Sequence, residues 1–127
     1  MPQQFTVRLK NEPGALAGLA RALADQGIDI RSLGVGAIGR YGCAVLSTNN
    51  DPAAREVLRR AKYSFIEGDV LPVSLEDQPG ALARLTGRLA SSGVNITSVL
   101  VVGRRQGKAD LALTVDDVER ARRLLGA

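Results

Sequence analysis

The chain has 127 residues and a mass of 13.4 kDa, enough for one ordinary domain or two small ones. Its composition, 45% hydrophobic and 24% charged with a net charge of +4, is that of a globular protein and excludes a disordered or collagen-like chain. The sequence lacks histidine and has a single cysteine, Cys43, which disfavours an enzyme, a metal site, a bound cofactor or an intrachain disulfide.

The first half of the chain alternates strand and helix patterns. Phe5, Val7 and Leu9 alternate with polar residues and predict a strand, and Pro13 opens a helix over 13–26 that Gly27 ends. Further segments follow this helix: two strands over 28–37 and 43–48 that form a hairpin, a helix from Asp51, and a strand over 64–67. The predicted order is βαββαβ.

The second half repeats this order and then stops. It predicts a strand over 70–76, a helix over 79–92, strands near 94–102 and 108–115, and a helix over 117–125, with no last strand. Pro72 falls in what should be a central strand, where its missing N–H would remove one ladder hydrogen bond, and the sequence offers no compensation.

An internal repeat explains the matching halves. Residues 11–30 match residues 77–96 with ten of twenty positions identical, at an offset of 66. The chain is therefore expected to hold two units, 1–69 and 70–127, of an α+β fold with antiparallel sheets and helices on one face.

The repeated motif is a strand, then N/D-x-P-G-A-L-A, an apolar helix, and G-[IV]-[DN]-I. It resembles the opening of the ACT domain, a ferredoxin-like βαββαβ ligand-binding module, and the whole chain is most similar to stand-alone tandem ACT-domain proteins. The resemblance implies a regulatory protein that binds an amino acid or related metabolite at an interface between two units, which often pair side by side into one eight-stranded sheet. It also implies that the loop residues Asn11 and Asp77 and the strand-opening residues Asp29 and Asn95 hold the backbone groups of the ligand.

The physical chemistry of the loop supports the same role. A helix N-terminus has unpaired N–H groups and partial positive charge, so it can bind a carboxylate, and glycine lets a ligand approach closely. The candidate ligand-binding residues are Asn11, Pro13, Gly14, Ala15, Leu16, Asp29 and Ile30 in the first unit, and Asp77, Gly80, Ala81, Leu82, Asn95 and Ile96 in the second. The alternative is that Asn11 and Asp77 only cap their helices.

Three other groups of residues have simpler interpretations. Cys43 lies in an apolar strand and is expected to be a buried small hydrophobe. The pairs Asn50-Asp51 and Asp116-Asp117 are expected to cap helices, and the glycines at 34–39 to lie in a bulged strand or hairpin tip rather than in a phosphate loop.

The two units differ at their candidate sites. If they pair about a pseudo-twofold axis, one site combines Asn11 with Asn95 and the other combines Asp77 with Asp29. Two carboxylates repel the carboxylate of an amino acid, so we expect one strong site per chain, at Asn11 and Asn95.

The favoured function is a non-catalytic sensor that passes ligand occupancy to a partner enzyme or regulator. One alternative is a ligand-free ACT module for interaction or oligomerisation, and a nucleic-acid-binding module is less favoured because its stacking aromatics would be limited to Phe5, Tyr41, Tyr63 and Phe65. The missing last strand leaves an open sheet edge, which predicts a homo-oligomer, at least a dimer. With no basic signal segment and no apolar run of about 18 residues, we expect a cytoplasmic protein without a membrane partner.

Overall fold

The structure, a computed structural model, describes residues 1–126. Residues Pro2–Gly68 form one compact unit, unit 1, and the chain from Asp69 onward forms the other, unit 2. Both units show the order βαββα, and among the described residues only unit 1 adds a final strand. The two ferredoxin-like units and the missing last strand of the second unit confirm the fold predicted from the sequence.

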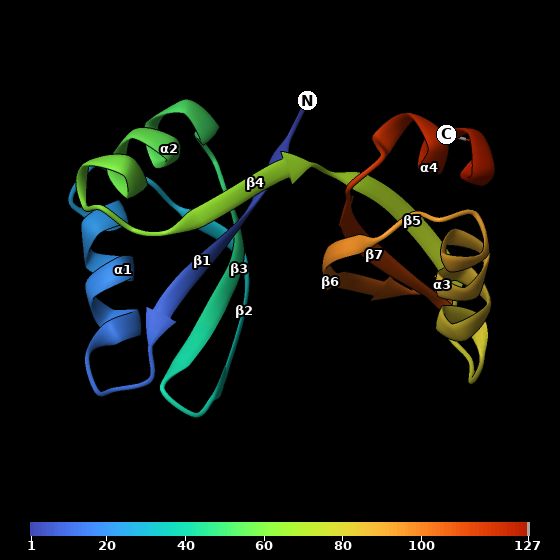
Figure 1. The fold of residues 1–127 in the computed structure, drawn as a ribbon, viewed down its shortest axis with the longest axis horizontal. Coiled ribbons are helices and arrows are strands. Elements are labelled where there is room, and N and C mark those ends of the chain that lie inside the picture. The colour runs from blue at the N-terminus through green and yellow to red at the C-terminus, as the bar shows by residue number, and fades with distance from the viewer. Residues whose placement is uncertain (127) are drawn as a thin grey trace. The chain divides into compact units, whose positions relative to one another are not determined.

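Unit 1 is a four-stranded sheet with two helices on one face (Figure 1). The strand order is β2-β3-β1-β4, and β1 and β2 both pair antiparallel with β3. Its elements are β1 (Gln3–Lys10), α1 (Ala15–Ala24), β2 (Ile30–Ile38), β3 (Tyr41–Thr48), α2 (Asp51–Arg60) and β4 (Phe65–Asp69).

The core of unit 1 lies between the sheet and the helices. Alternate residues of β1, namely Phe5, Val7 and Leu9, are buried there with Leu23 of α1 and Leu58 of α2. Each fully buried side chain of this size contributes about 1.5–3 kcal/mol relative to exposure. The alternation of apolar and polar residues along β1 therefore determines which face of the sheet the helices cover.

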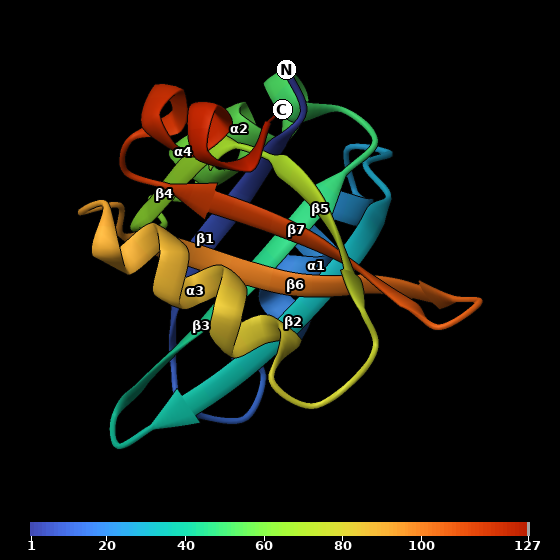
Figure 2. The same ribbon diagram turned by 90° about the vertical axis from the view of Figure 1, so that its right-hand side faces the viewer.

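Unit 2 has a three-stranded sheet of order β5-β7-β6, and Figure 2 looks onto it from the side of its helices. Its elements are β5 (Leu71–Glu76), α3 (Ala81–Ser91), β6 (Ile96–Arg105), β7 (Lys108–Val115) and α4 (Val118–Leu125). The core repeats that of unit 1, with Leu71, Leu85, Leu89 and Leu113 among its buried residues.

Pro72 lies in an edge strand, so its expected place in a central strand is wrong. In unit 1 the Arg8 N–H points to the β4 side of β1 and donates to the Ser64 carbonyl at 2.9 Å. Alternate residues share an edge, so Thr6 faces the same way, and Pro72 is the repeat counterpart of Thr6. The missing donor of Pro72 therefore faces the edge of β5 that has no neighbouring strand among residues 1–126, and no ladder bond is lost.

Cys43 is exposed, so its expected burial is also wrong. In β3 the side chains of Ala44 and Leu46 face the core, and both are fully buried. Cys43 is one residue out of phase and lies opposite Arg8 on the face away from the helices. The run from Cys43 to Leu46 is apolar on both faces, which hid the alternation.

Candidate functional site

The loop before the first helix has the same backbone geometry in both units. Gly14 precedes α1 with φ 89° and ψ −10°, and Gly80 precedes α3 with φ 89° and ψ −15°. These left-handed values favour glycine in both places, whether or not a ligand approaches. The helices begin at Ala15 and Ala81, two residues later than predicted, and Pro13 lies in the preceding turn.

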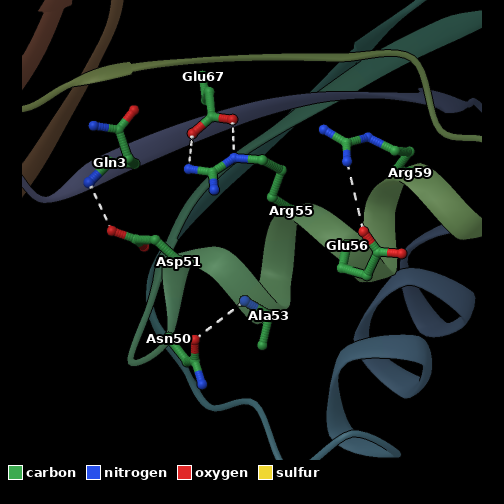
Figure 3. Close-up of polar contacts among 8 residues, drawn as sticks. All are labelled: Gln3, Asn50, Asp51, Ala53, Arg55, Glu56, Arg59 and Glu67. Carbon is green, nitrogen blue, oxygen red and sulfur yellow. Dashed lines mark hydrogen bonds and ion pairs between the residues drawn. The ribbon is translucent and has the colours of Figure 1, made fainter.

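The N-termini of α1 and α3 have no side-chain cap, whereas α2 and α4 are capped. Asn50 Oδ1 accepts from the Ala53 N–H at 3.1 Å (Figure 3), and Asp117 Oδ1 accepts from the Arg120 N–H at 3.0 Å. No side-chain oxygen accepts from the first turn of α1 or α3. The predicted caps on α2 and α4 are confirmed, and the alternative that Asn11 and Asp77 cap their helices is wrong.

Asn11 and Asp77 instead fasten their loops to the neighbouring hairpins. Asn11 Nδ2 donates to the Gly39 carbonyl at 2.8 Å, and its backbone N–H donates to the Arg40 carbonyl at 2.9 Å. The Asp77 N–H donates to the Gly107 carbonyl at 2.8 Å.

The carboxylate of Asp77 has a partner of its own. Its Oδ2 accepts from Arg104 Nε at 3.2 Å. This ion pair offsets the negative charge of the loop. The difference in charge between the Asn11 loop and the Asp77 loop is therefore smaller than the sequence suggested. Both side chains remain exposed and can contact a ligand.

The strand-opening residues also match between units. The Asp29 N–H donates to Asn49 Oδ1 and the Asn95 N–H donates to Asp116 Oδ1, each at 2.9 Å. Ile30 and Ile96 then begin β2 and β6, and each is followed by an irregularity in the strand register. Such bulges re-aim side chains at the start of a strand.

Within one unit the two sets of candidate residues lie at opposite ends of the sheet. Asn11 is bonded to the hairpin at the start of β3, while Ile30 pairs with Thr48 at the end of β3. At about 3.4 Å per residue, the length of β3 separates them by roughly 24 Å. A single unit therefore does not bring Asn11 and Asp29 together.

The helix-start residues differ in exposure. Leu16 and Leu82 are 37% and 49% exposed, whereas Ala81 is buried and Ala15 is partly buried. The N–H groups of Ala15 and Ala81 donate to the Glu12 and Gln78 carbonyls, each at 3.3 Å. A ligand at these helix ends would therefore meet the leucine side chains and the N–H groups that follow the two alanines.

A cavity of about 490 Å³ adjoins the start of α1 in unit 1. It lies where β1 extends past the first residue of β4, and Gly14, Ala15 and Gly18 form one wall. We call it the cation hollow, after the residues Arg8, Lys10 and Lys62, which line it together with Glu12, Tyr41 and Tyr63. The Arg8 guanidinium stacks on the Tyr41 ring at 3.8 Å from its centre.

Within residues 1–126, the three cations of the cation hollow form no ion pair with an acidic side chain. Among the described residues, ten basic side chains form ion pairs within 4.0 Å of a carboxylate, and Arg8, Lys10 and Lys62 are not among them. Sequence reasoning overlooked these residues because they come from separate elements, the end of β1 and the loop after α2.

Lys62 adopts a backbone conformation that favours glycine. Its φ is 62°, and the hydrogen bonds Lys62 N–H to Arg59 and Tyr63 N–H to Leu58 form a Schellman motif at the end of α2. The other three helices are followed by Gly27, Gly93 and Gly126, all with positive φ. A non-glycine residue here costs about 1–2 kcal/mol.

An ion pair holds the segment that carries Lys62. Arg55 of α2 makes two hydrogen bonds to the Glu67 carboxylate of β4, one of them 2.8 Å long between Nη2 and Oε2 (Figure 3). The Glu67 hydrogen bond raises the pKa of Arg55 above its usual value. Helix and strand are thus fastened on both sides of residues 61–64.

The corresponding region of unit 2 is a groove of about 530 Å³ along β5 and α3. Strand pairing places Ser74, Glu76 and Lys108 where unit 1 has Arg8, Lys10 and Tyr41. The groove is also lined by Arg84 and Arg88 of α3, and Lys108 pairs with Glu76 at 2.6 Å. The groove therefore takes its cations from other positions than the cation hollow does, and no tyrosine is among its lining residues.

A family model for the ACT domain matches residues 4–62 and 70–125. The chain belongs to the ACT domain family. The match covers both units and confirms the resemblance seen in the repeated loop motif.

Solved structures with the same fold cover nearly all of this ACT chain. Protein BT0572 from Bacteroides thetaiotaomicron is 22% identical with a TM-score of 0.76, over 98% of this chain and 86% of that one. The aspartate kinase regulatory subunit of Thermus thermophilus is 22% identical (TM-score 0.65, 98% and 91% covered), and that of Thermus flavus is 19% identical (TM-score 0.66, 99% and 92%). The comparison with curated proteins returned no match.

Two of the four aromatic residues of unit 1, Phe5 and Phe65, are placed where they cannot stack on nucleic acid bases. Phe5 is fully buried and packs against Phe65, with ring centres 6.1 Å apart, on the helix-covered side of the ACT sheet. Recognition of single-stranded RNA by a sheet needs aromatic rings on its open face. This arrangement disfavours the nucleic-acid alternative.

Two further observations concern the part of the ACT chain that the structure describes. None of its helices is long and apolar enough to cross a bilayer. Residues 1–126 contain no group of three or more acidic or cysteine side chains placed to hold a metal ion.

Proposed function

We propose that this protein is a non-catalytic sensor of an amino acid or a related small carboxylate. The ligand carboxylate accepts hydrogen bonds from the uncapped N-terminus of α1 or α3, and the occupied protein acts on a partner enzyme or regulator. The observation that carries the proposal is the contrast between α1 and α3, which lack a side-chain cap, and α2 and α4, which have one. Free N–H groups and the helix dipole together favour an anion.

The second half of the proposed site comes from another ACT unit. Because Asn11 and Asp29 lie at opposite ends of their sheet, a ligand held by both kinds of residue needs a loop from one unit and a strand start from another. We propose that a loop amide at Asn11 and the amide of Asn95 make the stronger site, and that Asp77 and Asp29 make the weaker one. The strands that carry the strand-opening residues, β2 in unit 1 and β6 in unit 2, both lie at the edges of their sheets, where they can pair with another unit.

A thermal-shift screen against the twenty amino acids tests the proposal. A ligand at one hundred times its dissociation constant adds about 2.7 kcal/mol to the free energy of unfolding, which raises the melting temperature measurably. Asn11→Ala should abolish most of the shift and Asp77→Ala should preserve it. Flat melting curves for all twenty would favour the ligand-free interaction module instead.

A further inference from the structure

We propose that the cation hollow makes unit 1 selective for small ligands that carry a second anionic group, a carboxylate or a phosphate, besides the carboxylate at the α1 N-terminus. This inference rests on the proposed function, because Gly14 and Ala15 belong both to the loop site and to the wall of the hollow.

The charge of the hollow is the first argument. Three cations and one acid, Glu12, line it, and no described carboxylate lies within 4.0 Å of the nitrogens of Arg8, Lys10 or Lys62. Elsewhere on this chain most basic side chains are paired. A concave site lined by one sign of charge attracts ligands of the opposite sign.

The backbone of Lys62 is the second argument. Glycine would fit the left-handed position after α2 with less strain, and Gly27 and Gly93 occupy the same hydrogen-bonded position after α1 and α3. Here the strained residue carries an ammonium group at the edge of a cavity, and strain of this kind marks places where a side chain has a use other than stability.

The tyrosines supply the third argument. Tyr41 and Tyr63 line the same cavity, and the Tyr41 ring holds the Arg8 guanidinium by stacking. Their hydroxyl groups can donate to carboxylate or phosphate oxygens. The volume of about 490 Å³ suits a small metabolite rather than a macromolecule.

Unit 2 differs from the cation hollow in its pairing and its aromatic rings. Its groove is lined by Arg84, Arg88 and Lys108, but Lys108 stands in the place of Tyr41 and pairs with Glu76, and no tyrosine is among the lining residues. A site that combines unpaired cations with tyrosine hydroxyl groups is therefore expected in unit 1.

The experiment compares matched ligand pairs by calorimetry on the full chain: glutamate against glutamine, phosphoserine against serine, and inorganic phosphate alone. The wild-type protein should bind the anionic member of at least one pair about 10-fold more tightly, which is the range of one charge-assisted hydrogen bond. This preference should shrink as the salt concentration rises.

Two variants of Lys62 separate charge from backbone. Lys62→Gly removes the ammonium and relieves the left-handed strain, so the preference should fall about 5- to 10-fold while the melting temperature stays equal or rises by about 1–4 °C. Lys62→Gln removes the charge and keeps the backbone strain. It should therefore lose the preference for the anionic ligand without a rise in melting temperature. The control is Gln106→Gly, since Gln106 is the other non-glycine residue with positive φ among residues 1–126.

The outcomes distinguish this inference from the proposed function. Glutamine and serine binding as tightly as glutamate and phosphoserine, or a preference that survives in both Lys62 variants, would overturn the inference and leave the amino-acid sensor standing. Phosphate binding that depends on Lys62, with no binding of any amino acid, would support the hollow as an anion site and remove the amino-acid function. No binding of any probe would overturn both.

Discussion

Gly14 and Gly80 each serve two purposes at the residue scale. Their left-handed φ of 89° allows the chain to turn from strand into helix, and the lack of a side chain leaves space beside the helix start, which the Arg84 guanidinium approaches in unit 2. Replacing either glycine would strain the backbone as well as block a ligand, so such variants cannot separate binding from folding. Ala17 and Ala83, at the third position of the same helices, are exposed and better suited to this purpose.

Ala17→Glu should have opposite effects on stability and on binding. A carboxylate in the first turn of α1 complements the helix dipole and should add about 0.3–1 kcal/mol to the free energy of unfolding. The same charge repels a ligand carboxylate, so affinity should fall. Chemical denaturation and calorimetry measure the two quantities, and Ala17→Gln is the uncharged control.

The equivalent change in unit 2 tests the difference between the units. Ala83→Glu should stabilise α3 by a similar amount. If unit 1 holds the stronger site, Ala83→Glu will leave most of the binding intact. Equal losses in the two variants would show that both sites bind equally.

At the scale of elements, side chains on neighbouring strands of unit 2 form hydrogen bonds and an ion pair with each other. Ser74 of β5 lies opposite Asp110 of β7, and its hydroxyl donates to Asp110 Oδ1 at 2.6 Å. Arg105 of β6 donates to the same carboxylate at 3.0 and 3.2 Å. The Ser74 hydrogen bond, followed by that of Arg105, lowers the pKa of Asp110 below its usual value.

Ser74→Ala should therefore raise the pKa of Asp110 and change how stability depends on pH. A lowered pKa in the folded state gives a contribution that is complete above the unfolded value of about 3.9 and is lost as the pH falls through the folded pKa. The variant should be less stable than the wild type at neutral pH, and the gap should narrow below about pH 4. NMR titration of the Asp110 carboxyl measures its pKa directly. An unchanged pKa of Asp110 in Ser74→Ala would contradict the role given to the Ser74 hydrogen bond.

The helices and strands show which parts of the fold could be predicted from the sequence alone. Strand alternation at Phe5, Val7 and Leu9 and the repeat at an offset of 66 predicted the strands and helices of both units, because these signals are local. The faces of β3 and the place of β5 in its sheet were wrong, since each depends on neighbours distant in sequence. The cation hollow was missed for the same reason, although one signal was present: Gly27, Gly93 and Gly126 follow their helices, and Lys62 breaks that pattern.

At the scale of the whole molecule, exposed apolar residues on edge strands predict self-association. Leu33 and Val35 of β2 are 44% and 48% exposed, and Val101 of β6 is 51% exposed. Edge strands with such residues are open to pairing with another chain. Light scattering at micromolar concentration should give at least twice the mass of 13.4 kDa.

Charged variants of these edges test the same expectation. Val35→Lys or Val101→Lys places a lysine on an edge strand, which opposes strand pairing without removing core contacts. We expect at least one of them to shift the molecule toward the monomer. A wild-type mass of 13.4 kDa in light scattering would contradict the prediction.

The proline ring lies at the edge of β5 that pairs with no strand in the described part of the chain, and it bears on how this protein behaves at high concentration. Fibrillar aggregation grows by adding strands to open edges, and each addition needs backbone donors along that edge. Pro72 lacks one of these donors, so it hinders the addition of strands in fibrillar aggregation. The backbone groups of Ser74 and the residues after it can still pair with a strand of a specific partner. Pro72→Thr, which restores the residue found at the repeat position in unit 1, should leave the melting temperature nearly unchanged and accelerate aggregation in a concentrated sample. Thioflavin fluorescence over several days, with Thr6→Ser as a matched change in unit 1, would measure how far a single missing N–H protects the soluble state.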